Sequence, residues 1–218
     1  VRTGSRLTQL RLRRGRAEVT PQDLLQLHDE FGLIDAPFDR AEVLEHESLS
    51  LRLDLGADAP GGIVGWRARH HTGIVDVDRP ASYNAADFWE PVSARNGGII
   101  LNPDDFYILA TREAVTVPPD YAAEMVAYDT LVGEFRVHYA GFFDPGFGWH
   151  PDDRSAGSRG VLEVRSHDVP FLLEHEQVIG RLRYERLIDR PEKIYGTGIG
   201  SHYQGQGLKL AKQFKSPE

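Results

Sequence analysis

The stretch "GVLEVRSHDVPFLLEHEQVIGRLRYERL", residues 160–187, decides the fold class of this chain. Three short strand patterns follow one another in it: GVLEV, PFLL and VIGRLRYERL. Each pattern is only a few residues long, and turn-forming residues separate it from the next. Such a run of short strands predicts an all-β domain rather than a parallel sheet alternating with helices.

Strand patterns of the same kind fill the chain from about residue 48. They read SLSLRLDLG, GIVGWRARH, GIVDVD, GGIILNP, DFYILATREAVTVP and FRVHYAGFFDPG. Gly, Pro, Asn and Asp separate them at the spacing expected of a β-barrel or sandwich. The one helix signal in this part of the chain is KLAKQF, residues 209–214.

The first 47 residues have a different pattern. In "TPQDLLQLHDEFG", Thr20 is a good N-cap, Pro21 suits the first turn, and Gly32 predicts the end of a helix. Residues 5–13 alternate like a ragged strand, and "TGSRLTQLRLR" lies over "HEQVIGRLRYE", residues 175–185. We interpret residues 1–16 as the terminal strand of a preceding similar domain, 17–47 as a helical linker and 48–218 as the main domain, although two amphipathic strands can also look alike by chance.

Composition excludes several classes of function. The chain has 218 residues, a net charge of −8 and no cysteine. The acidic balance argues against a binder of duplex DNA, and the lack of Cys excludes disulfides, iron–sulfur clusters and thiolate zinc sites. No apolar run approaches the roughly 20 residues of a membrane-spanning helix, and the basic N-terminus lacks the apolar region of a signal peptide. We expect a cytoplasmic protein.

Glu163 is unusual because it interrupts an apolar strand, between Leu162 and Val164. Three interpretations stay open on physical grounds: a solvated edge residue, an ion pair with a nearby Arg such as Arg165, or a catalytic base. A Glu buried in such a strand would have a raised pKa and could exchange protons near neutral pH. Asp144, in the turn signal Asp-Pro-Gly, could share acid, base and positioning roles with it.

Other candidate motifs carry weaker signals. Histidines lie beside glutamates in LEHES and LEHEQ, and two are adjacent in RHH, but none has the HExxH spacing of a metalloprotease. The stretch "YGTGIGSHYQGQG", residues 195–207, is neither a P-loop nor a dinucleotide fingerprint. A flexible loop and a lid that closes over a ligand remain equally good interpretations.

The order of four motifs resembles the deoxycytidine triphosphate (dCTP) deaminases. GFFDPGFG, GVLEVRS, VIGRLRYERL and YGTGIGSHYQGQG follow one another as in that family, and "ILNPDDFYILATREAVTVPPDYAAEM" resembles its segment before the active site. The resemblance covers about residues 48–210. It implies the trimeric deoxyuridine triphosphatase fold, a distorted, jelly-roll-like β-barrel with few helices. The tail of a preceding half resembles the long, tandem-domain form of the family.

The resemblance also implies roles for individual residues. Glu163 would be the general base that activates a water molecule for attack on C4 of cytosine, and Asp144 would contact the deoxyribose or order the site. Backbone groups of Ala140 and Val161 would hold the base and the water. The closing loop would contribute Tyr195, His202 and Gln206, with Tyr195 and Gln206 near the triphosphate and His202 where the family usually has Lys.

Cofactors and partners follow from the same resemblance. Mg²⁺ would arrive with the triphosphate, and no zinc is expected, because zinc nucleoside deaminases need a Cys-containing motif. Deoxycytidine and deoxyuridine nucleotides would be the ligands of a homo-oligomer, either a trimer or a pseudo-trimeric assembly of tandem halves. No nucleic acid polymer and no membrane is expected as a partner.

One segment departs from the family pattern. The family has a Ser-Ser-x-x-Arg motif that binds phosphates where this chain reads "AYDTLVGEFR", residues 127–136, with Asp129 and Thr130 near the serine positions and no Arg in the expected place. An acidic Asp129 would repel a triphosphate, so a preceding half could supply the grip. Two rival functions therefore remain: a pyrophosphatase or bifunctional enzyme that forms the monophosphate, and a non-catalytic half that only binds nucleotide or completes the oligomer.

Overall fold

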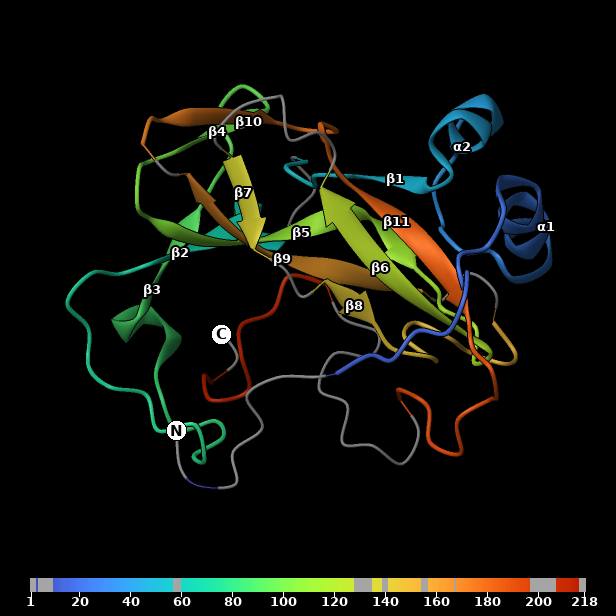
Figure 1. The fold of residues 1–218 in the computed structure, drawn as a ribbon. Helices are drawn as coiled ribbons and strands as arrows, with labels where there is room; N and C mark the ends of the chain where they lie inside the picture. The colour runs from blue at the N-terminus through green and yellow to red at the C-terminus, as the bar shows by residue number, and fades with distance from the viewer. Residues whose placement is uncertain are drawn as a thin grey trace.

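The computed structural model of the chain describes most of its length. It covers residue 3 and residues 10–56, 60–127, 135–138, 141–153, 157–166, 168–196 and 207–215, with the backbone alone at 60, 127 and 135–138. The fold is mainly β, as predicted, and all pairings between its strands are antiparallel (Figure 1).

Two sheets and one strand pair make up the fold. The four-stranded sheet has the order β1 (Leu49–Arg52), β11 (Val178–Arg186), β6 (Tyr121–Ala127) and β8 (Phe142–Phe143). The five-stranded sheet has the order β3 (Trp89–Val92), β2 (Gly65–Ala68), β5 (Phe106–Val115), β9 (Ser158–Ser166) and β7 (Phe135–His138). The separate pair is β10 (Phe171–Glu174) with β4 (Gly98–Leu101).

The main core forms where inward-facing residues of both sheets meet. Along β9, Leu162 and Val164 are buried, and Leu109 of β5 and Leu182 of β11 belong to the same cluster. Full burial of an aliphatic side chain of this size contributes about 1.5–3 kcal/mol. The core therefore fixes which face of each strand is turned outward, and that choice positions the candidate site.

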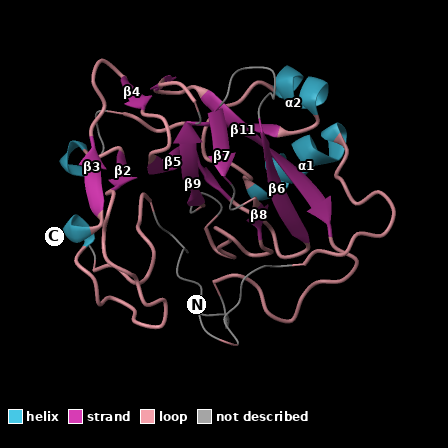
Figure 2. Ribbon diagram, turned by 60° about the vertical axis from the view of Figure 1, so that its left-hand side comes forward, coloured by secondary structure: helices cyan, strands magenta, loops and turns pink. Residues whose placement is uncertain are grey.

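Two α-helices cover the core beside β1 and β11, on the side of the molecule away from β2 and β3 (Figures 1 and 2). Helix α1 (Pro21–Phe31) begins at the predicted N-cap Thr20 and ends at Gly32, which has a φ of 64°. Helix α2 (Arg40–His46) begins at the N-cap Asp39 and was not predicted separately. The helices bury Leu24, Leu27 and Val43 in the main core. Two short 3₁₀ helices complete the helical content, η1 (Pro60–Gly62) and η2 (Ala85–Asp87).

Two predicted elements are wrong. The strand predicted over 73–78 is irregular, because no neighbouring strand pairs with it, and Ile74 is 95% exposed. The helix signal at 209–214 is a turn that ends in a bridge between Phe214 and Tyr83. Its apolar spacing serves contacts with the five-stranded sheet rather than a helix.

Strands β3 and β6 were missed, since Pro91 interrupts the first and alanines dominate the second. The ragged strand predicted over 5–13 lies partly outside the described residues, and residues 10–13 have no strand pairing. The division into a preceding strand, a linker and a main domain stays a prediction.

Candidate active site

Glu163 lies on an inner strand, not at a sheet edge. In the register of the five-stranded sheet it stands opposite Ile108 of β5 and His138 of β7. Burial alternates along β9, so that Val161, Glu163 and Arg165 face outward. Glu163 is exposed, so the case of a buried carboxylate does not apply, and its place on an inner strand removes the interpretation as an edge residue. The alternation causes this exposure, because the buried face of β9 belongs to Leu162 and Val164.

A second apolar cluster lies beside Glu163 on this outward face. Trp66 of β2 pairs with Ile108, which pairs with Glu163, so these three residues form one row across the sheet. Trp66 and Ile108 are both buried, and Val161 packs against the same cluster. Glu163 therefore stands at the border of a buried apolar cluster, beside the partly exposed Val161.

The C-terminal segment, residues 207–215, covers this cluster. Leu210 is buried against it, and Phe214 packs on Trp89 with 5.9 Å between the ring centroids. Hydrogen bonds to residues 77–83 anchor the segment; among them, Lys215 N donates to Tyr83 O at 2.9 Å, and Gln213 Nε2 donates to Val77 O at 2.8 Å. The end of the chain therefore belongs to the same face of the molecule as Glu163.

The predicted Asp-Pro-Gly turn is confirmed, and Tyr195 lies against it. Phe147 N donates to Asp144 O at 3.0 Å, which closes the turn, and Tyr195 N donates to Pro145 O at 2.7 Å. The Tyr195 ring packs on Phe147 with a centroid distance of 5.5 Å. Gly146 has a φ of 91°, and a Cβ there would stand 2.8 Å from Tyr195 O. This contact needs glycine.

The structure thus brings the predicted site residues together in two groups. Asp144 and Tyr195 meet at the turn that follows β8, the last strand of the four-stranded sheet. Val161 and Glu163 share the outward face of the other sheet. Gly160 of β9 lies close to Phe143 of β8, since a Cβ on it would stand 3.5 Å from that ring, but it does so on the buried face of β9, opposite the face that carries Glu163. The predicted residues Ala140, Asp129, Thr130, His202 and Gln206 lie outside the described residues.

A polar network that the sequence did not predict lies at the start of β5. Asp105 is 6% exposed and receives hydrogen bonds from Asn102 Nδ2 at 3.2 Å and Tyr107 Oη at 3.3 Å. His70 Nε2 lies 2.7 Å from Asp105 Oδ1, and Arg67 lies 3.6 Å from Oδ2. The adjacent histidines of RHH were the available signal, and one of them, His70, contacts Asp105.

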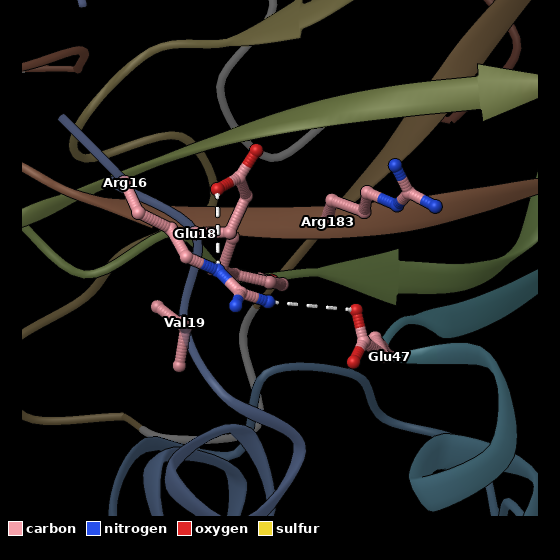
Figure 3. Close-up of a pocket in the computed structure, with 6 residues that line it drawn as sticks. Arg16, Glu18, Val19, Glu47 and Arg183 are labelled. Atoms are coloured by element: carbon pink, nitrogen blue, oxygen red, sulfur yellow. Dashed lines mark ion pairs between the residues drawn. The ribbon is translucent and has the colours of Figure 1, made fainter. Parts of the chain in front are cut away.

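Two of the histidines singled out in the sequence contact other parts of the chain, His70 at Asp105 and His175 at Leu55. His175 Nδ1 accepts the backbone N–H of Leu55 at 3.0 Å. Within the described ranges, no three His, Asp or Glu side chains come close enough together to hold a metal ion. A cavity of about 280 Å³ lies elsewhere, between residues 16–19 and β11, where Arg16 is 3.9 Å from both Glu18 and Glu47 (Figure 3). Its charges balance one another, and it is remote from Glu163 in the sheet order.

No helix in the described part of the chain has the length and apolar character that crossing a membrane requires. The cytoplasmic location stays a prediction.

Comparison with known families decides the relationship. Residues 20–214 match the family described as "2'-deoxycytidine 5'-triphosphate deaminase (DCD), C-terminal domain". The chain belongs to this family. The dCTP deaminase match includes both α-helices and extends through the C-terminal segment to Phe214.

Relatives of this dCTP deaminase family member agree with the assignment. A dCTP deaminase crystal structure from Agrobacterium tumefaciens is 51% identical with a TM-score of 0.69, over 82% of this chain and 50% of that chain. A "dCTP deaminase, dUMP-forming" from Beutenbergia cavernae is 35% identical over 49% of this chain and 53% of its own length. Another of that name, from Mycobacterium avium, is 30% identical over 78% and 81%. The chain thus spans about half the length of the first curated relative and of the solved structure.

Proposed function

We propose that this chain contributes the catalytic carboxylate to the hydrolytic deamination of dCTP, which yields dUTP and ammonia. The observation that carries the proposal is the position of Glu163. Its carboxylate is exposed on an inner strand and borders the apolar surface of Trp66 and Ile108. An uncharged cytosine ring can pack at the border of this apolar cluster, with the Glu163 carboxylate beside the edge of the ring.

In the proposed reaction, Glu163 takes a proton from a water molecule as the water oxygen bonds to C4 of cytosine. The same carboxyl delivers that proton to N3 and then moves the proton of the new C4 hydroxyl to the amino nitrogen. The C4–N bond breaks, the oxygen stays on C4, and ammonia leaves. Backbone groups of Val161 and Ala140 would orient the base and the water, and both roles follow from the family resemblance rather than from a contact in the chain.

The second group of residues would act on the sugar and phosphates. Asp144 would contact the deoxyribose, and Tyr195 would bind near the triphosphate with His202 and Gln206. The hydrogen bond from Tyr195 N to Pro145 O supports a common role, since it fixes the start of the Gly-rich segment beside Asp144. Mg²⁺ would enter with the nucleotide, held by phosphate oxygens and water, because the described side chains form no cage of their own for it.

The active assembly would combine this chain with a second similar domain. In support, the side chains of residues 10–13 point in two directions. Arg11 bonds Glu185 at 2.9 Å, and Arg13 pairs with Glu185 at 2.6 Å, whereas Leu10 and Leu12 are 83% and 86% exposed. The leucines would pack into a preceding half, and the halves would form trimer-like sites in which one half grips the phosphates.

A second candidate function is the bifunctional reaction that continues to dUMP and pyrophosphate. The names of the relatives from B. cavernae and M. avium favour it. Assaying ammonia and pyrophosphate separately in one dCTP reaction distinguishes the two. Ammonia alone supports the deaminase, and equal amounts of ammonia and pyrophosphate support the bifunctional enzyme. The absence of both products would contradict a catalytic role.

A further inference from the structure

Arg165 occupies the outward face of β9 two residues after Glu163. Two residues along a strand span about 7 Å, so a cation and a carboxylate stand side by side on one surface. The Arg165 side chain is exposed, and its guanidinium carbon lies 5.0 Å from the centroid of the Phe106 ring. Phe106 is the residue opposite Arg165 on β5.

A row of aromatic rings supports the Arg165 guanidinium. Phe106 packs on Trp89 at 6.0 Å between centroids, and Trp89 packs on Phe214 of the C-terminal segment at 5.9 Å. A guanidinium stacked on a ring keeps its orientation while its N–H groups remain free to donate. The support therefore reduces the rotamer freedom that a long side chain would lose on binding an anion.

Arg165 differs from the other arginine on the outward face of β9. Arg159 is ion-paired with Asp54, and Arg67 of the neighbouring β2 is paired with Glu90. Among the residues that the structure describes, Arg165 has the Phe106 ring as its partner and no carboxylate. Its charge is therefore available to a ligand on the face that carries Glu163.

We propose that Arg165 binds the phosphate chain of the nucleotide whose base Glu163 deaminates. The inference rests on the proposed function and adds to it a phosphate contact within this chain. A nucleoside triphosphate separates its base from its anionic end by the sugar, which matches two unlike groups about 7 Å apart. The planar fork of Arg suits phosphate oxygens, and the contact would offset the lack of an Arg at the family's phosphate-motif position within residues 127–136.

The test is a series of affinities for deoxycytidine, dCMP, dCDP and dCTP. Calorimetry is done on chains that carry Glu163→Gln, so that the ligands are not consumed, with and without Arg165→Gln. We expect Arg165→Gln to weaken dCTP binding by about 10- to 100-fold and to leave deoxycytidine binding unchanged. The shortest nucleotide for which the affinities with and without Arg165→Gln differ identifies the phosphate group that Arg165 contacts.

Two further variants make the test specific. Arg183→Gln removes another exposed Arg, on β11 of the other sheet, and should leave the whole series unchanged. Phe106→Leu removes the stacked ring but keeps an apolar residue, and should weaken dCTP binding only a few-fold. Thermal unfolding shows whether each variant is folded.

The outcomes separate this inference from the proposed function. If the Glu163→Gln parent binds none of the four ligands, even in a longer chain that includes a preceding similar domain, the proposed function fails and the inference falls with it. If the parent prefers dCTP over deoxycytidine and Arg165→Gln keeps the full preference, the phosphate role of Arg165 is overturned while the proposed function stands. An equal loss for dCTP and deoxycytidine also overturns it, because a structural defect would affect both.

Discussion

Glu163 and Arg165 are neighbours on one face of β9 because side chains alternate along a strand. That alternation can be recognised in the sequence, so Glu163 could be identified as a candidate residue before the fold was known. Its surroundings could not, since Ile108 and Trp66 come from strands more than 50 residues away and only the sheet register brings them beside it. Periodicity carries no information about register, so the sequence left the surroundings of Glu163 open.

Asp105 offers a test of electrostatics at the residue scale. Burial raises the pKa of its carboxyl, but hydrogen bonds with His70 and Asn102 and the charge of Arg67 outweigh this, and the pKa lies below its ordinary value. A lowered folded pKa stabilises the protein above the unfolded pKa of about 3.9, and this contribution disappears as pH falls through the folded pKa.

Asp105→Asn should therefore lower the free energy of unfolding by about 1–3 kcal/mol at pH 7 and by less at pH 3. Urea unfolding at the two pH values measures the difference. Asp120→Asn, at an exposed carboxylate, is the control and should stay within about 0.5 kcal/mol of the parent. A deficit for Asp105→Asn that is equal at both pH values would contradict the role of its charge.

At the scale of elements, the sequence predicted correctly those elements that local signals alone can form. Helix α1 has a capping Thr20, a Pro in its first turn and a C-terminal glycine, and its predicted limits are confirmed. The signal at 209–214 failed because tertiary contacts decide that segment: Leu210 and Phe214 are held by the aromatic cluster of the five-stranded sheet. The Asp-Pro-Gly turn was predicted, but its contact with Tyr195 is nonlocal and was not.

Gly146→Ala tests the contact between that turn and the segment ending at Tyr195. A Cβ at this position would meet Tyr195 O at 2.8 Å and Ile194 Cβ at 2.9 Å. The matched control is Gly61→Ala, since Gly61 also has a positive φ, of 64°, but has no atom within 4 Å of the added Cβ.

We expect Gly146→Ala to cost about 1–3 kcal/mol more than Gly61→Ala in urea unfolding, because both variants share the backbone strain and only the first adds a clash. Equal costs for the two variants would mean that the turn and Tyr195 are not in close contact.

At the scale of the whole molecule, the exposed leucines of residues 10–13 support a tandem arrangement. Leu12 is 86% exposed, and the chain spans half of a solved relative that is 51% identical. Composition and motifs predicted the family and the mainly β fold, but a single chain cannot reveal which of its apolar surfaces a neighbouring domain covers.

Leu12→Ser should change the free energy of unfolding of this chain by less than about 0.5 kcal/mol. In a longer chain that includes a preceding domain, the same substitution should cost about 2–4 kcal/mol, as for a core leucine. Leu172→Ser, at a residue that is 57% exposed, is the control in both chains. No cost for Leu12→Ser in the longer chain would argue against the tandem packing.

The central claim is that Glu163 is the carboxylate that activates water, and ammonia release by Glu163→Gln tests it most directly. With dCTP as substrate, we predict a rate lower by about 10²- to 10⁴-fold, with a dCTP dissociation constant within about 3-fold of the parent. Glu174→Gln, at an exposed strand glutamate outside the site, should keep the parental rate. Parental ammonia release by Glu163→Gln would contradict the claim.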